Sequence, residues 1–234
     1  MRMETENQLK LVQNSYDEAI ELGKKGIDRY KDLPEYITKD PDYPAYKKWT
    51  SEGVSAQSGR KEIRDYLSPK KNMKFIDLGC SLNLMFRGYD KWPSFYYGVD
   101  ISSNTIHLLN DFIKNKELCI GSLHCGSIHE TPFEANFFDI GACIGVLEYY
   151  EKDFVAKAIL EVHRIMKPNG RFVLDIPNIG NPTCRIMKLI EEHLRRPDKF
   201  DMSPTEFEEI VKNSFDIEKT DDEAMVHYYL TCRK

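Results

Sequence analysis

The sequence has no apolar run long enough to cross a membrane. Its longest one, residues 140–147, holds eight residues and includes two glycines, whereas a membrane-spanning helix needs about 20. Residues 1–6 are polar and acidic and have no apolar core of the kind found in a signal peptide. These absences predict a cytoplasmic protein without a membrane partner.

Positive charge is also in short supply. The 234 residues carry 33 Lys and Arg against 38 Asp and Glu, a formal net charge of −5. A nucleic-acid-binding protein needs a basic surface for the phosphates, so the sequence predicts no nucleic-acid partner. We interpret the short basic pairs as solvated faces and linkers: Lys24-Lys25, Lys47-Lys48, Lys70-Lys71 and Arg195-Arg196.

The six cysteines lack the spacing of a disulfide framework, and no CxxC pair is present. One group could be considered for zinc, but its members fall in an expected strand and loop, where neighbouring side chains point to opposite faces. A structural role is favoured there, and no metal is predicted. The group consists of Cys119, His124, Cys125 and His129.

Strand and helix patterns alternate from residue 73 to the end of the chain. We predict helices at 104–116 and 153–166 and, from residue 203, after a capping box with proline at the first helical position. A turn is expected at 167–170. Such alternation predicts a mostly parallel sheet with helices on both faces. Its strands are expected at 75–78, 96–99, 118–125, 139–146 and 171–176, followed by a final pair at 215–219 and 224–232.

The first 72 residues read as a helical extension. Residues 4–31 have an amphipathic helical pattern, and residues 51–67 look helical again. Three prolines between residues 32 and 49 argue against a long helix there. We therefore predict two parts, an extension or lid at 1–72 and an α/β domain at 73–234.

Two short apolar runs predict a cofactor that contains a nucleoside. The first ends at Asp77 and a glycine turn, and the second ends at Asp100, 23 positions later, which is about the length of a βαβ unit. A carboxylate that closes the second strand can accept hydrogen bonds from both ribose hydroxyls. The glycine turn lets a ligand approach the backbone.

Four segments, in order, resemble motifs of the class I S-adenosylmethionine-dependent methyltransferases. Residues 75–80 (FIDLGC) look like the first motif, and residues 99–102 (VDIS) look like the ribose-binding strand end. Residues 138–149 look like the fourth strand and its exit, and residues 161–170 (EVHRIMKPNG) are similar to the helix and turn before strand five. The resemblance implies a Rossmann-like α/β fold, a seven-stranded sheet with an antiparallel last strand, and S-adenosyl-L-methionine as cofactor.

The resemblance also implies roles for individual residues. Asp77 would orient the glycine turn and the methionine end of the cofactor, and Asp100 would hold the ribose hydroxyls. The other expected cofactor contacts are Gly79, Cys80 and Ser81 in the turn, Ile101 at the adenine face, Ser127 and Ile128 at the adenine edge, and Cys143 and Ile144 under the methionine moiety.

Three positions depart from the family pattern and keep other functions open. Ser81 and Asn83 stand where the loop usually has glycine, and Ser127 stands where an acidic residue is frequent. They support the alternative of a degenerate, non-catalytic module that binds the cofactor weakly or binds a partner instead. A nicotinamide-dependent dehydrogenase is disfavoured, because residues 79–84 keep one glycine of GxGxxG and a pyrophosphate needs close backbone approach.

Methyl transfer from a sulfonium needs alignment and a water-poor site, and it needs a base only if the acceptor must lose a proton. The catalytic candidates are Glu148 and Tyr149 after strand four and Asn178 after strand five. His163 falls in a helix and is not assigned a catalytic role.

The acceptor is expected to be a small molecule, and the protein a monomer or a homodimer. Aromatic side chains on the extension could stack on a planar acceptor or attract a cationic one. Residues 179–200 would form another wall of the acceptor pocket. The substrate and lid candidates are Tyr16, Tyr43, Tyr46, Trp49 and Tyr150.

Overall fold

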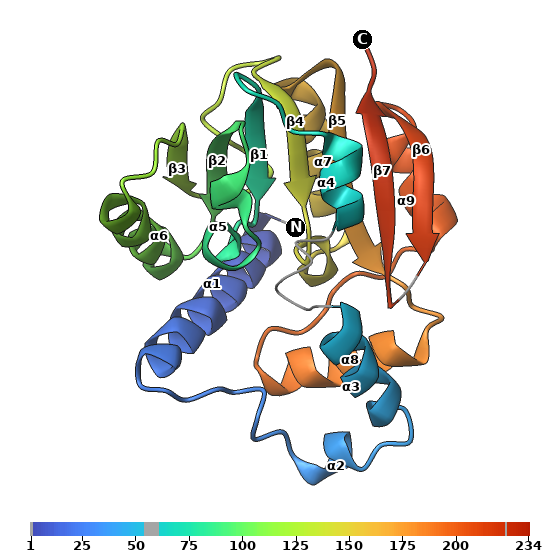
Figure 1. Ribbon diagram of the computed structural model, residues 1–234. Helices are drawn as coiled ribbons and strands as arrows, with labels where there is room; N and C mark the ends of the chain where they lie inside the picture. The colour runs from blue at the N-terminus through green and yellow to red at the C-terminus, as the bar shows by residue number, and fades with distance from the viewer. Residues whose placement is uncertain (1, 54–60, 223) are drawn as a thin grey trace.

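The computed structural model describes residues 2–53, 61–222 and 224–234. Its centre is a seven-stranded sheet of order β3-β2-β1-β4-β5-β7-β6 (Figure 1). β7 runs antiparallel to both neighbours and the other strands run parallel to one another, as predicted. The strands are β1 (Lys74–Leu78), β2 (Phe95–Asp100), β3 (Ser122–Cys125), β4 (Phe138–Cys143), β5 (Met166–Pro177), β6 (Phe215–Asp222) and β7 (Met225–Cys232).

Helices cover both faces of the sheet, because the strand side chains alternate between two apolar clusters. On one face, Phe75 and Val173 pack with α4 (Lys61–Leu67), α5 (Asn83–Phe86) and α6 (Ser103–Lys116). On the other face, Ile76 and Leu174 pack with α7 (Lys152–Ile165) and α9 (Pro204–Val211). The two-sided burial explains why the central strands are apolar almost throughout.

Four helices gather at the carboxyl ends of the parallel strands, below the sheet in Figure 1. They are α1 (Arg2–Lys24), α2 (Glu35–Thr38), α3 (Tyr43–Gly53) and α8 (Pro182–His193). α2, α3 and α8 share a small apolar cluster of their own around Ile37 and Ile190. In an open α/β sheet, ligands bind at this edge. Two short 3₁₀ turns, Tyr89–Lys91 and Leu147–Tyr149, complete the secondary structure.

The extension differs from the sequence-based prediction in three places. α3 is a helix of 11 residues within the stretch where prolines argued against one. Pro44 is its second residue, and proline in the first turn breaks no intrahelical hydrogen bond. The helix predicted at 51–67 is observed as the end of α3 and as α4, and residues 54–60 lie outside the described chain. α1 ends at Lys24 rather than near residue 31, just before Gly26, whose φ is +74°.

Several strand boundaries also differ from the prediction. β4 stops at Cys143 because Gly145, with φ +73°, turns the chain away from the sheet. β5 begins at Met166 rather than at residue 171, because Met166 pairs with Phe138 ahead of a bulge that holds the predicted turn. β3 starts at Ser122, four residues later than predicted. Among the helices of the described residues, none is long and apolar enough to cross a membrane.

Gly141 in the middle of β4 should not tolerate a side chain. A Cβ there would lie 2.6 Å from Ile76 Cγ2 and 2.7 Å from Phe172 Cδ2, and both of those side chains are buried. We expect Gly141→Ala to lower the free energy of unfolding by about 1–3 kcal/mol, the usual effect of overpacking. Urea unfolding followed by circular dichroism measures the change.

Gly23→Ala is the matched control for this experiment. A Cβ at Gly23, near the end of α1, would meet no atom within 4 Å. Alanine restricts the unfolded chain and favours helix, so we expect a gain of up to about 1 kcal/mol. Equal losses in both variants would contradict the packing described for β4.

Candidate functional site

A cavity of about 330 Å³ opens at the carboxyl edge of the sheet. Its floor comes from the loops that follow β1, β2, β3 and β4, and α1, α3 and α8 contribute residues from the other side. The lining residues are Val12, Tyr16, Tyr30, Trp49, Gly79, Ser81, Asn83, Arg87, Asp100, Ile101, Gly126, Ser127, Ile128, Ile144, Gly145, Val146, Glu148, Tyr149, Tyr150 and Glu191.

The turn after β1 is held tightly against the end of β4. Gly79 has φ +69°, and a Cβ on it would lie 2.2 Å from Val146 Cγ2. The amides of Gly79 and Cys80 both donate to the Val99 carbonyl, at 2.8 and 2.9 Å. Ser81, with φ +40°, adopts the left-handed conformation that glycine would favour. Ser81 therefore does not change the path of the turn, and a ligand in the cavity can still approach the backbone there.

The Asp100 carboxylate is held by two hydrogen bonds and can still accept others. It is 8% exposed, and its two oxygens accept one hydrogen bond each, from the amides of Ser81 at 2.7 Å and Ser102 at 2.9 Å. Burial raises the pKa of this carboxyl, and the two amides oppose that rise. Each carboxylate oxygen has further lone pairs. These can accept from the two hydroxyls of a ribose in the cavity.

Apolar and polar side chains line the cavity beside Asp100. Ile101 and Ile128 line the cavity beside it, and they offer apolar contact for a base. Ser127 also lines the cavity, and its Oγ lies 2.6 Å from His129 Nδ1. Ser127 is thus already hydrogen-bonded on one side.

Asp77 lies behind the cavity wall rather than on it. The side chain is 1% exposed and accepts hydrogen bonds from Tyr96 Oη at 2.9 Å and Asn83 Nδ2 at 3.2 Å. Desolvation by burial raises its pKa to about 7, against the opposing effect of these two donors. Asn83 does line the cavity, so Asp77 acts on the site by orienting Asn83.

Glu148 differs from the other carboxyl groups of the site because one of its oxygens lacks a hydrogen-bond partner among the described residues. It is 7% exposed and lines the cavity, yet within the described chain its Oε2 has no hydrogen-bond partner. Burial, followed by the nearby charge of Asp175, raises its pKa well above the usual range of a glutamate. Its backbone carbonyl is fixed by the amides of Lys199 and Phe200, at 2.8 and 3.1 Å. The backbone is therefore held, while Oε2 of the carboxyl group has no donor among the described residues.

A tyrosine network closes the cavity on the side of α8. Tyr149 Oη donates to Glu191 Oε2 at 3.1 Å and lies 3.0 Å from Tyr16 Oη, which leaves Tyr16 as the donor of that second bond. Arg196 pairs with Glu191, and its guanidinium lies 4.6 Å from the Tyr16 ring centre. Arg196 also donates to the Tyr30 hydroxyl. The network joins α1 to α8 across the cavity.

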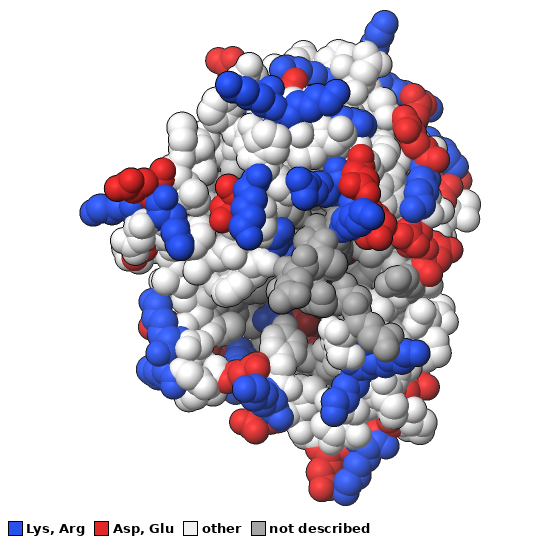
Figure 2. Space-filling model, viewed as in Figure 1, with Lys and Arg blue, Asp and Glu red and all other residues white. Residues whose placement is uncertain are grey.

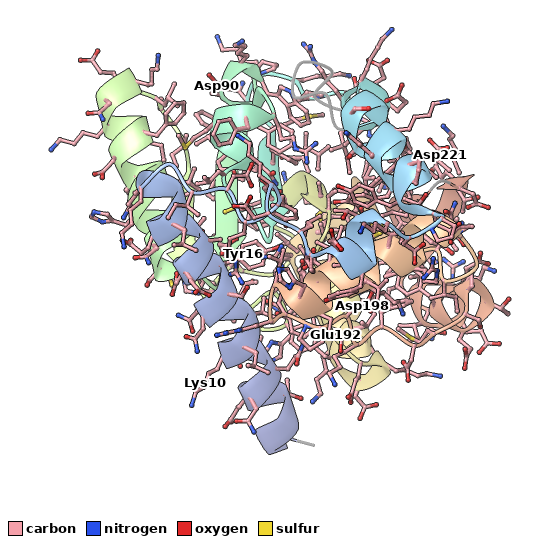
Figure 3. The ribbon with its side chains drawn as sticks, turned by 90° about the horizontal axis from the view of Figure 1, so that it is seen from below. Lys10, Tyr16, Asp90, Glu192, Asp198 and Asp221 are labelled. Carbon is pink, nitrogen blue, oxygen red and sulfur yellow. The ribbon has the colours of Figure 1, made fainter. Side chains whose placement is uncertain are left out.

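α1 is fixed over the site by further bonds along its length. Gln8 Nε2 donates to the Tyr149 carbonyl at 2.8 Å, Ser15 Oγ donates to the Leu194 carbonyl at 2.8 Å, and Ser102 Oγ donates to Asp17. In the view from below, Tyr16 lies toward the middle of the molecule and Lys10 points outward (Figure 3). The amino-terminal helix thus forms the roof of the cavity.

The structure brings most of the predicted site residues together and leaves six outside the lining. Twelve predicted residues line the cavity: Tyr16, Trp49, Gly79, Ser81, Asp100, Ile101, Ser127, Ile128, Ile144, Glu148, Tyr149 and Tyr150. The six that do not are Tyr43, Tyr46, Asp77, Cys80, Cys143 and Asn178.

Asp77 lies behind the cavity wall, as described above, and the other five residues have contacts elsewhere. Cys80 and Cys143 are buried in the apolar clusters on opposite faces of the sheet, so their side chains point away from the turn. Tyr43 and Tyr46 pack against the cluster that includes α8. The Asn178 amide bonds to the Ala224 carbonyl at 3.1 Å, which ties it to the start of β7.

Sequence reasoning expected a wall from residues 179–200 but did not single out Glu191 or Arg196, and it missed Tyr30. The interpretation of Arg196 as part of a solvated basic pair was wrong, since this residue is 2% exposed. A signal for α8 existed: Asn181 caps the Thr183 amide at 2.8 Å, and Pro182 follows at the first helical position. Recognising that helix would have placed Glu191 near the strand ends. Within the described chain, no group of three or more His, Cys, Asp or Glu could hold a metal ion.

The raised pKa of Asp77 predicts a pH-dependent stability. Its pKa is about 7 in the fold and 3.8 for an ordinary solvated aspartate, so the folded state holds an extra proton between these values. This group therefore makes its full contribution to stability below about pH 4. The contribution is lost as the pH rises from about 4 through about 7. The loss is on the order of 4 kcal/mol, because about three pKa units separate the two states.

Asp77→Asn removes the titration and keeps an acceptor for Tyr96. We expect the free energy of unfolding to fall less between pH 5 and pH 8 in this variant than in the wild type, measured by urea unfolding. Asp201→Asn, at an exposed position, should follow the wild type. Parallel curves for Asp77→Asn and the wild type would contradict the assignment.

Known proteins share parts of this sequence and its fold. Residues 76–174 match a family model described as a methyltransferase domain. An uncharacterized protein of Methanocaldococcus jannaschii is 32% identical over 110 residues, which cover 47% of this chain and 43% of that protein. Matches to curated relatives cover 38–43% of the relatives' lengths, so these relatives are much longer than the region they share.

Solved structures share the fold over most of this chain. A protein of Pyrococcus horikoshii OT3 superposes with a TM-score of 0.61 at 17% identity and covers 86% of this chain and 100% of its own. Geranyl diphosphate C-methyltransferase of Streptomyces coelicolor A3(2), in complex with Mg²⁺, geranyl-S-thiolodiphosphate and S-adenosyl-L-homocysteine, gives 0.62 at 16% identity. That match covers 86% of this chain and 85% of the other. At these identities the likeness establishes a common fold.

Proposed function

We propose that this chain, whose residues 76–174 form a methyltransferase domain on the class I fold, transfers a methyl group from S-adenosylmethionine to a small-molecule acceptor. The observation that carries the proposal is Asp100, a buried carboxylate at the end of β2 that is anchored by two amides and still has lone pairs facing the cavity. A carboxylate at the end of this strand is suited to accept hydrogen bonds from ribose hydroxyls, which supports the proposal.

The rest of the lining supports the same cofactor. Ile101 and Ile128 would contact the adenine ring, and Ser127 would face its edge. The turn at Gly79 and the side chain of Asn83 would lie along the methionine part. The cofactor has no phosphate groups, so a loop with a single glycine of the dinucleotide pattern is sufficient.

The cofactor supplies an activated methyl group on a sulfonium. The chain aligns the two reactants and limits the access of water to them. α1 and α8 cover the cavity and exclude water through the Tyr16–Tyr149–Glu191 hydrogen bonds. Glu148, Tyr149 and Tyr150 would face the acceptor, beyond the end of β4. Trp49 lines the same cavity from α3, as a lid residue would.

A small acceptor suits a cavity of about 330 Å³ better than a polymer does. The face drawn in Figure 2 carries acidic and basic side chains interspersed, without a continuous basic stripe. The diphosphate named for the Streptomyces protein is an unsuitable model for this acceptor. Arg87 is the one basic residue among the described cavity-lining residues, and it comes from the loop after β1 rather than from the wall that holds Glu148.

Calorimetric titration with S-adenosylmethionine and S-adenosylhomocysteine tests the proposal. Asp100→Asn keeps an acceptor for one amide but loses the charge that strengthens the ribose hydrogen bonds. We expect affinity for both ligands to fall roughly 10- to 100-fold, since hydrogen bonds to charged groups contribute about 1.5–3 kcal/mol.

Asp111→Asn, on the exposed face of α6, is the control and should bind like the wild type. Unfolding temperatures of all three proteins report whether the fold is intact. If folded wild-type protein binds neither ligand, the methyltransferase proposal fails and the chain is a non-catalytic module. Unchanged binding by Asp100→Asn would remove Asp100 from the site.

A further inference from the structure

The buried carboxyl groups at the carboxyl edge of the sheet have hydrogen-bond donors, but one oxygen of the Glu148 carboxyl group is an exception. Asp77 has Tyr96 and Asn83, and Asp100 has the amides of Ser81 and Ser102. Asp175 accepts from the Gly145 amide at 2.7 Å and faces His227 Nε2 at 3.7 Å. The described protein offers no donor to Oε2 of Glu148. A buried acceptor without a donor is costly, so a ligand group is the natural partner for Glu148.

The charges around Glu148 favour a cation as that partner. The carboxylates of Asp175, Glu191 and Asp198 all oppose ionisation of Glu148. Nearby basic groups are committed elsewhere: Arg196 pairs with Glu191, and Lys188 Nζ lies 3.8 Å from Asp198 Oδ1. A positive charge bound in the cavity next to Glu148 would be attracted by Glu148 and Asp175, whereas Glu191 and Asp198 each already face a basic group. A negative charge would be repelled by Glu148 and Asp175.

Aromatic rings line the same part of the cavity. Tyr16, Tyr149 and Tyr150 come from α1 and from the segment after β4, and Trp49 comes from α3. The faces of such rings attract ammonium groups. The Tyr16 ring already has the Arg196 guanidinium 4.6 Å from its centre, and the Tyr150 ring stacks on Phe154. Tyrosine rings with a buried carboxyl group are a suitable environment for an organic cation with an apolar body.

We propose that the methyl acceptor is a primary or secondary amine, bound as an ammonium whose N–H donates to the Glu148 carboxyl group between the tyrosine rings. This inference rests on the proposed function, because it assigns the acceptor of that reaction. It makes Glu148 both the counter-ion of the amine and the group that receives its proton.

The proton balance of the step is simple. The ammonium gives one proton to the Glu148 carboxylate and becomes a neutral amine with a free lone pair. The nitrogen then attacks the sulfonium methyl, so that an N–C bond forms and the C–S bond breaks with its electron pair left on sulfur. The products are a methylated ammonium and S-adenosylhomocysteine. The proton on Glu148 leaves to solvent afterwards, and a raised pKa suits this group to receive it at neutral pH.

Three probes of one shape test the inference: 2-phenylethylamine, neutral 2-phenylethanol and anionic 3-phenylpropanoate. Each is titrated by calorimetry into protein saturated with S-adenosylhomocysteine. We expect the amine to bind roughly tenfold or more tightly than the alcohol, and the anion to bind most weakly. With S-adenosylmethionine in place of S-adenosylhomocysteine, mass spectrometry should detect methylated amine.

Glu148→Gln keeps the shape of the side chain and removes its charge. We expect it to lose roughly tenfold or more in affinity for the amine, with little change for the alcohol or for S-adenosylhomocysteine. Glu192→Gln is the matched control, since Glu192 is exposed on α8 next to Glu191 (Figure 3). This variant should bind all ligands like the wild type.

The outcomes separate the two proposals. If S-adenosylhomocysteine binds but the amine binds no better than the alcohol, or Glu148→Gln keeps full affinity for the amine, the amine inference is overturned and the proposed function stands. If folded protein binds neither form of the cofactor, both are overturned. Preference for the amine that Glu148→Gln loses, with cofactor binding intact, establishes the acceptor class.

Discussion

The burial of negative charge at the carboxyl edge of the sheet is the constraint on which this molecule depends. Parallel strands end there together, and β1, β2 and β5 each carry an aspartate near that end, Asp77, Asp100 and Asp175. Each is buried and therefore needs donors. The Gly79 turn, the start of α6 and the Gly145 turn provide amide or side-chain donors to them. The shape of the site follows from these bonds, and Oε2 of Glu148 is left without a donor among the described residues.

The amino-terminal segment completes the site by a separate mechanism. α1 contributes little to the sheet's own core apart from Val12 and its neighbours, and it is held over the cavity by hydrogen bonds to α8 and to the loops after β2 and β4. Tyr149 is the junction, since its hydroxyl contacts both Tyr16 and Glu191. Residues far apart in sequence thus form one wall. That wall determines what can reach Glu148.

Much of this was predictable from sequence, and the failures have physical causes. The Asp77–Asp100 spacing and the alternating apolar runs indicated the sheet and the glycine turn, because local periodicity determines both. The extension as a lid, with Tyr16 in it, and a wall from residues 179–200 were expected, but the Tyr16, Tyr149 and Glu191 contacts were not predictable, because they depend on how α1 and α8 pack. Arg196 was misread for the same reason, since a buried guanidinium looks like any surface arginine in sequence. Pro44 misled because its effect depends on its position in the helix.

The pKa of the Glu148 carboxyl group tests the central claim most directly. It can be followed by the carboxyl ¹³C shift in glutamate-labelled protein, with Glu148→Gln to assign the signal. We predict a pKa well above the ordinary glutamate range in the free protein, and a fall when S-adenosylhomocysteine and 2-phenylethylamine are both bound, because a nearby cation favours the ionised form. An ordinary pKa that neither ligand changes would contradict the account.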